Sequence, residues 1–339
     1  MKITLKDILK LIFSIALTGF ILYKTSEDND WGKAKDAIIN FNYGWILLSV
    51  FLSILSHLLR AYRWNLLLDT SGYKPGIMNT YMALMVGYLS SMAIPRLGEV
   101  TRCTMLKRTN NIPVSFSLGT VITDRLLDVL MLFLLMIFLL LMKFELLKSF
   151  FVNFIETKAP LVIQYWPILI LIAIGGIAFI IWLIKKSKED NEGNRLLSKL
   201  IRFTVDVTKG IRAIREIQSP LRFWVSTFSI WILYFLMLYV ISFGYGPTAD
   251  MSLMAGVAVL VMGSFGMLAP VNNGIGVYQA FVASILVAFG IAYKDGYVFA
   301  VISHGSQVVA IILIGFLSLL ILNFRKKEQQ IETDSSQSS

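Results

Sequence analysis

The apolar residues of this chain are gathered into long uninterrupted blocks, and this arrangement restricts the fold more than any other feature. Hydrophobic residues make up 56% of the chain and charged residues only 15%, whereas about a quarter of a soluble domain is charged. A helix needs about 20 apolar residues to cross a bilayer. We predict an all-α, polytopic membrane protein with about six crossing helices, at 5–23, 43–60, 114–142, 161–184, 221–243 and 297–322.

Two further apolar stretches, 78–113 and 251–292, are broken by proline, glycine and polar residues. The first break contains Pro95, Gly98 and Glu99. The second break, in the sequence APVNNGIGVYQ, contains Pro270, Asn272, Asn273, Gly274 and Gly276. We interpret the proline and glycine residues as hinges of two re-entrant helical hairpins. The alternative is a pair of ordinary proline-kinked helices.

The distribution of basic residues favours the re-entrant interpretation. With the N-terminus inside and both broken stretches returning to the face they entered, 23 Lys and Arg residues lie inside and seven outside. If the first stretch crossed instead, 20 would lie outside and 10 inside. Cytoplasmic loops carry the excess of basic residues. The two hairpins then enter from opposite faces, which is typical of an inverted repeat with a binding site between its halves.

The chain is otherwise predicted to form one transmembrane domain over 1–325. The first helix has no small-residue cleavage site after it, so we expect it to be retained. The segment 185–222 is predicted to be a basic amphipathic helix on the cytoplasmic leaflet. The polar tail, 326–339, is expected to be disordered. The net charge of +10 is explained by basic cytoplasmic loops and anionic lipid, so we expect no nucleic-acid partner.

The strongest candidate for a functional site is DRLLD, which contains Asp124, Arg125 and Asp128. The fourteen apolar residues that follow rise only about 21 Å, less than the ~30 Å hydrocarbon core. The three charges must therefore lie in the inner half of the membrane, with Asp124 and Asp128 on one helix face. Such charges usually face a partner or a cavity; the alternative is a pair that only locks two helices.

Two other groups accompany the breaks. Arg96, Glu99 and Arg102 suit a phosphate or a phospholipid head group, although positive-inside placement explains part of this charge. In the second break, uncharged hydrogen-bonding groups come from Asn272, Asn273 and Gln279; the alternative here is an ordinary glycine-rich outer loop.

Residues of the second and last spans have simpler interpretations. Tyr62 and Trp64 fit an interfacial aromatic belt beside His57 and Arg60. We expect His304 to make a hydrogen bond between packed helices. No nucleotide-binding, metal-ligand or hydrolase motif occurs, and Cys103 is the single cysteine. We therefore predict no cofactor, no metal site and no catalytic residue.

Four short motifs occur in a particular order: RAYRWNLLL, PRLGEVTR, DRLLD and PVNNGIGVYQ. Together they resemble the membrane domain of the lysylphosphatidylglycerol synthase/flippase family, over essentially residues 1–325. The resemblance implies a flippase-like fold that moves a charged lipid between leaflets. The positions that match the family's motifs are Arg96, Gly98, Glu99, Arg102, Asp124, Arg125, Asp128, Gly274 and Gly276.

The chain departs from the family in two respects. It has no soluble aminoacyl-transferase domain, so we expect it not to synthesise lysylphosphatidylglycerol. Gln279 also stands where many relatives carry an ionisable residue.

These observations lead to a hypothesis and two alternatives. The hypothesis is a flippase or transporter of a charged phospholipid or lipid-linked precursor in the bacterial cytoplasmic membrane, with both termini cytoplasmic and membrane phospholipid as its partner. The first alternative is a membrane transferase acting on a lipid-linked substrate. The second is an accessory subunit that assembles with a partner membrane enzyme; a homo-oligomer is a further possibility for its assembly.

Overall fold

The computed structural model describes residues 39–94, 97–149, 205–268 and 271–337, together with three isolated residues, Asp36, Val152 and Gly175. Side chains are described as far as Phe324, apart from that of Asn272. Several predicted features lie outside these residues: the span 5–23, the span 161–184 apart from Gly175, the segment 185–204, and Pro95, Arg96 and Pro270.

The described part of the chain is helical and contains no strand. Four of its helices are long and apolar enough to cross a membrane. They are α3 (Tyr43–Asp69), α6 (Val114–Met142), α9 (Pro220–Ser242) and the portion Tyr293–Phe324 of α12 (Tyr293–Gln337). The prediction of an all-α membrane protein is confirmed at this level, and α6 has the predicted boundaries.

Local sequence explains where several helices start. The Asn42 side chain accepts a hydrogen bond from the Gly44 amide, 3.1 Å away, and so caps α3. Pro220 occupies the first turn of α9, where its missing N–H costs nothing. The polar residues at the end of α12 include good helix formers such as Lys, Glu and Gln. This helix continues to Gln337, through the tail that composition predicted to be disordered.

Each broken stretch forms a pair of short helices. The first pair is α4 (Ile77–Ala93) and α5 (Leu97–Asn110), and the second is α10 (Leu253–Leu268) and α11 (Val277–Ala288). Ile94 adopts an extended backbone (φ −135°, ψ 121°) and ends α4, as expected before a proline. The second turn contains a short 3-10 helix, η3 (Asn272–Gly274).

Close glycine contacts hold each pair together. A Cβ on Gly98 would lie 2.3 Å from the carbonyl oxygen of Gly87, so α4 and α5 approach more closely than any larger residue would allow. Gly266 similarly faces the backbone of Tyr278 across the second pair. Gly98 therefore serves close helix packing within α5, whereas Gly274 (φ 68°) and Gly276 (φ 86°) have the left-handed backbone of a true turn.

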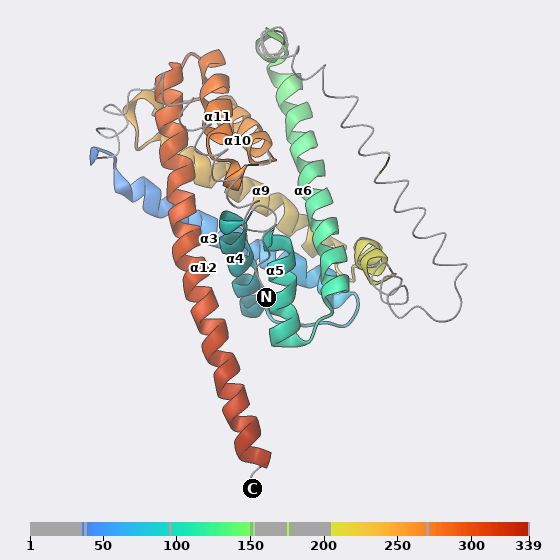
Figure 1. Cartoon of the computed structure of the whole chain (residues 1–339). Helices are drawn as coiled ribbons and strands as arrows, with labels where there is room; N and C mark the ends of the chain where they lie inside the picture. The colour runs from blue at the N-terminus through green and yellow to red at the C-terminus, as the bar shows by residue number, and fades with distance from the viewer. Residues whose placement is uncertain are drawn as a thin grey trace.

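The two pairs pack into opposite ends of the bundle. At the open end of the first pair, the Asn110 side chain donates to the carbonyl of Pro75 (3.3 Å), so α5 returns to the point where α4 began. This is the end where α3 stops and α6 starts. The second pair lies between the end of α9 and the start of α12 and belongs to a separate buried cluster that includes Phe41 and Tyr245. Figure 1 shows α10 and α11 beside the start of α12, and α4 and α5 beside its middle.

The segment after residue 204 docks on α6 through small residues. Helical residues 205–212 lead into a 3-10 turn, Ala213–Glu216. Gly210 contacts Gly119 of α6 so closely that neither has room for a Cβ, and Ala213 is fully buried. Ile211 is exposed on the surface of the described chain. The face that packs against α6 is thus formed by small residues that permit close backbone approach.

Candidate functional site

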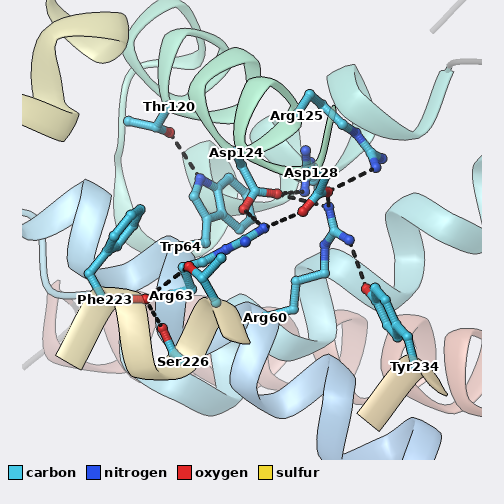
Figure 2. A network of polar contacts seen from close by, with 12 residues as sticks. Arg60, Arg63, Trp64, Thr120, Asp124, Arg125, Asp128, Phe223, Ser226 and Tyr234 are labelled. Atoms are coloured by element: carbon cyan, nitrogen blue, oxygen red, sulfur yellow. Dashed lines mark hydrogen bonds and ion pairs between the residues drawn. The ribbon is translucent and has the colours of Figure 1, made fainter. Parts of the chain in front are cut away.

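A buried ionic network joins α3 to α6 near the first helix pair. Arg60 and Arg63 lie one turn apart on α3, and Asp124 and Asp128 lie one turn apart on α6. Each arginine bridges both aspartates through a single terminal nitrogen: Arg60 Nη2 is 2.9 Å from Asp124, and Arg63 Nη2 is 2.7 Å from Asp128. Figure 2 shows this reciprocal arrangement.

The network is largely shielded from solvent. The side chains of Arg63 and Asp124 are 0% exposed, and that of Asp128 is 16% exposed. Arg60 also donates from Nη1 to the hydroxyl of Tyr234 on α9, 2.8 Å away. Removing one partner of such a buried pair typically costs 3–5 kcal/mol, because the remaining charge is stranded. The network therefore fixes α3, α6 and α9 relative to one another.

Two residues of α5 extend this network toward the surface. Glu99 pairs with Arg125 of α6 at 3.3 Å, and both side chains are partly exposed. Arg102 is only 2% exposed and lies over the ring of Trp64, with 4.9 Å between the guanidinium carbon and the ring centroid. The carboxylate nearest to Arg102 is Asp124, at 3.9 Å, and none of the three guanidinium nitrogens has a hydrogen-bond partner among the described residues.

Sequence reasoning identified most of this network but missed two of its members. Glu99, Arg102, Asp124, Arg125 and Asp128 were all predicted to be site residues, and the structure brings them together. The span that we ended at residue 60 instead continues to residue 69. The arginines at its end were therefore assigned to a basic inside loop. Two arginines at a spacing of three, followed by LLL, are the signal that could have revealed a longer buried helix.

The prediction that Trp64 belongs to an interfacial aromatic belt is also wrong. Its side chain is fully buried, and its Nε1 donates to the Thr120 hydroxyl at 2.9 Å. An interfacial tryptophan would face lipid and water. Here the ring makes a cation–π contact with Arg102, and its hydrogen bond to Thr120 connects α3 to α6.

A second polar cluster closes the turn of the α10–α11 pair. Gln279 Oε1 accepts from the Gly276 amide at 2.7 Å, while its Nε2 lies 3.2 Å from His304 Nδ1. Asn273 contacts the other ring nitrogen at 3.4 Å. The expected packing role of His304 fits this geometry. Because Gln279 Oε1 accepts from the Gly276 amide, Gln279 Nε2 is left as a donor to His304 Nδ1.

The two clusters belong to different helix pairs. The ionic network lies beside α5, whereas the neutral cluster lies at the turn between α10 and α11 and reaches α12. The turn does contact α4, so the second pair approaches the first. Among the described residues, no group of three or more His, Cys, Asp or Glu side chains could hold a metal ion.

The fold and this site define a multi-pass α-helical membrane protein with charged side chains buried between its helices. The model of the lysylphosphatidylglycerol synthase TM region matches residues 8–315. The chain belongs to this family, as its motifs suggested.

The chain is also similar to a curated archaeal protein, the UPF0104 membrane protein MJ1595 of Methanocaldococcus jannaschii. The two are 21% identical over 230 residues, which cover 66% of this chain and 63% of the relative. The match thus spans less than two thirds of that relative's length. No solved structure matches the chain.

Proposed function

We propose that the protein translocates a charged phospholipid or lipid-linked precursor between the leaflets of a cytoplasmic membrane. Membership of a lipid-related membrane family is consistent with this role. In the proposed mechanism, the head group passes between the helices while the acyl chains remain in lipid. In this mechanism the two helix pairs act as re-entrant hairpins from opposite faces, and the turn of the second pair, which contacts α4, lies near the path of the head group.

One observation carries the proposal: α3 presents a continuous buried polar face along most of its length. The side chains that form it are all at most 9% exposed: Ser49, Ser53, Ser56, His57, Arg60 and Arg63. They recur at three and four residues, so they share one side of the helix. Polar groups are expensive within a membrane and usually face a partner or an aqueous path.

Neighbouring helices continue this face with polar groups of their own. Gln307 of α12 donates to Ser49 at 2.9 Å, while its own Oε1 lacks a partner among the described residues. His57 Nδ1 is likewise buried without a partner in the described chain, beside the ring of Tyr88. A helix surface built only for packing would satisfy these atoms. A travelling head group would supply the missing hydrogen bonds in passing.

Reconstitution into vesicles tests the proposal directly. Purified protein should make inner-leaflet fluorescent lipid accessible to an external quencher faster than protein-free vesicles do. Gln307→Leu keeps the side-chain size but removes polarity from the path, so it should slow translocation by about tenfold, the effect of losing one or two hydrogen bonds. Leu313→Ala, at an exposed position of α12, is the matched control.

The same experiment separates this proposal from a transferase. Wild-type protein that never exceeds the empty-vesicle rate would refute translocation. A covalently altered lipid recovered from those vesicles would instead support the transferase alternative.

Re-entrant topology has a separate test. Ser71 precedes the first helix pair, Lys107 lies in its last turn and Asp250 precedes the second pair; all three are exposed, whereas the native Cys103 is buried. Cysteines introduced at Ser71 and Lys107 should react with an impermeant thiol reagent from the cytoplasmic side. A cysteine at Asp250 should react from the outside. Labelling of the first two positions from opposite sides would show that the stretch crosses.

A further inference from the structure

The charges of the ionic network do not balance. Among the described residues it contains four arginines and three carboxylates, which leaves one surplus positive charge. The four arginines are Arg60, Arg63, Arg102 and Arg125. An isolated charge buried in a membrane protein is costly unless something compensates it.

Each of the two aspartates already accepts hydrogen bonds from both Arg60 and Arg63. Both oxygens of Asp124 and both oxygens of Asp128 accept from either Arg60 or Arg63. The third carboxylate, Glu99, is paired with Arg125. Every carboxylate of the network is therefore already paired with an arginine, which leaves no unpaired negative charge for an ammonium group of a ligand. The acids of this site balance arginines and do not form a cation site.

The arginines of the network, in contrast, retain hydrogen-bond donors that have no acceptor among the described residues. Every guanidinium nitrogen of Arg102 lacks an acceptor among the described residues, as do Nη1 and Nε of Arg63. The Trp64 ring offers Arg102 a cation–π contact, which leaves all of its N–H groups unused. Arg102 is thus a 98% buried cation whose planar donor set has nothing to bind within the described chain.

We infer that Arg102 is the centre of an oxyanion site for a phosphodiester whose remaining head group carries no charge. A guanidinium fork binds phosphate oxygens in bidentate fashion. A phosphodiester carries one negative charge, which matches the surplus, whereas a phosphate monoester carries nearly two. A hydroxyl-bearing head group needs no carboxylate partner. The lipid source of this phosphodiester rests on the proposed function, while the oxyanion chemistry stands on the network alone.

The test uses the full-length protein in detergent micelles, with binding measured by native mass spectrometry and by lipid-dependent thermal stabilisation. The probes are phosphatidylglycerol, phosphatidylethanolamine and inorganic phosphate. We expect phosphatidylglycerol to bind at least about tenfold more tightly than phosphatidylethanolamine, because the ammonium of the latter enters a site with surplus positive charge in which every carboxylate is already paired with an arginine. Inorganic phosphate should bind weakly, since it lacks the acyl chains.

Arg102→Gln should lower the affinity for phosphatidylglycerol by about tenfold or more, the effect of losing a charge-assisted hydrogen bond. It removes a surplus buried charge that has no hydrogen-bond acceptor among the described residues, so it should not lower the melting temperature without lipid. Arg108→Gln, an exposed arginine on the same helix, is the control and should bind like the wild type. Arg102→Lys keeps the charge but loses the planar guanidinium, so its affinity for phosphatidylglycerol should lie between those of Arg102→Gln and the wild type.

Three results would overturn the inference. They are equal binding of the two lipids, wild-type binding by Arg102→Gln, and stabilisation by inorganic phosphate equal to that by phosphatidylglycerol, which would remove the lipid source. Failure of translocation is distinguishable from all three. A protein that binds phosphatidylglycerol through Arg102 but never moves it keeps the oxyanion site and loses the transport function.

Discussion

Asp124 is the residue on which the stability of the helix bundle should depend most. Its carboxylate is fully buried and accepts from both Arg60, at 2.9 Å, and Arg63. Asp124→Asn retains the shape but removes the charge, and its amide can turn only one oxygen toward two guanidinium groups. Four arginines would then face two carboxylates. We expect unfolding to become easier by about 3–5 kcal/mol, the usual cost of stranding a buried charge.

The measurement is a thermal melt of purified protein in detergent, followed by tryptophan fluorescence and by recovery of the monodisperse peak. Asp69→Asn is the matched control. It removes the same kind of carboxylate from the end of α3, where the acid meets the exposed Lys74 at 3.6 Å. A surface pair contributes about 0–1 kcal/mol, so this control should melt near the wild type.

A double variant sharpens the test. Arg63→Gln alone should destabilise the protein about as much as Asp124→Asn does. The double variant should lose less stability than the sum of the two single losses, because each change removes the charge that the other leaves without its partner. The reasoning is refuted if Asp124→Asn has the same melting temperature as Asp69→Asn. It is also refuted if the loss of stability in the double variant equals the sum of the losses in the two single variants.

Three further predictions concern packing and the edge of the network. Gly98→Ala should destabilise the first helix pair and reduce the yield of folded protein, because its Cβ would meet the Gly87 carbonyl at 2.3 Å. Gly119→Ala should detach residues 205–212 from α6, since the new methyl group would enter that backbone; faster proteolysis of the segment is the readout. Tyr234→Phe removes one acceptor from the network and should lower stability by about 1–3 kcal/mol in the same thermal melt.

The class of protein and much of its secondary structure could be predicted from the sequence. Hydropathy defined α6 to the residue, and the proline and glycine residues placed both breaks between short helices. Asp124 and Asp128 were recognisable because charges beside fourteen apolar residues cannot all remain in water. These inferences rest on local properties: length, periodicity and the cost of burying a charge.

The partners of those charges could not be predicted in the same way. Arg63 lies 61 residues before Asp124 in the chain, and nothing near either residue specifies the other. The positive-inside rule assigned Arg60 and Arg63 to a loop, because it counts charges without knowing which of them a folded bundle will bury. Packing alone showed that α3 continues past them and faces α6.

The sequence by itself thus determined a helical membrane protein with two broken segments and a pair of acids within reach of the bilayer. Only the tertiary structure decided that both acids are paired with the same two arginines and that Arg102 has no hydrogen-bond acceptor among the described residues. The physical reason is that hydropathy depends on each residue separately. Charge balance within a buried site depends on which side chains from distant helices meet there.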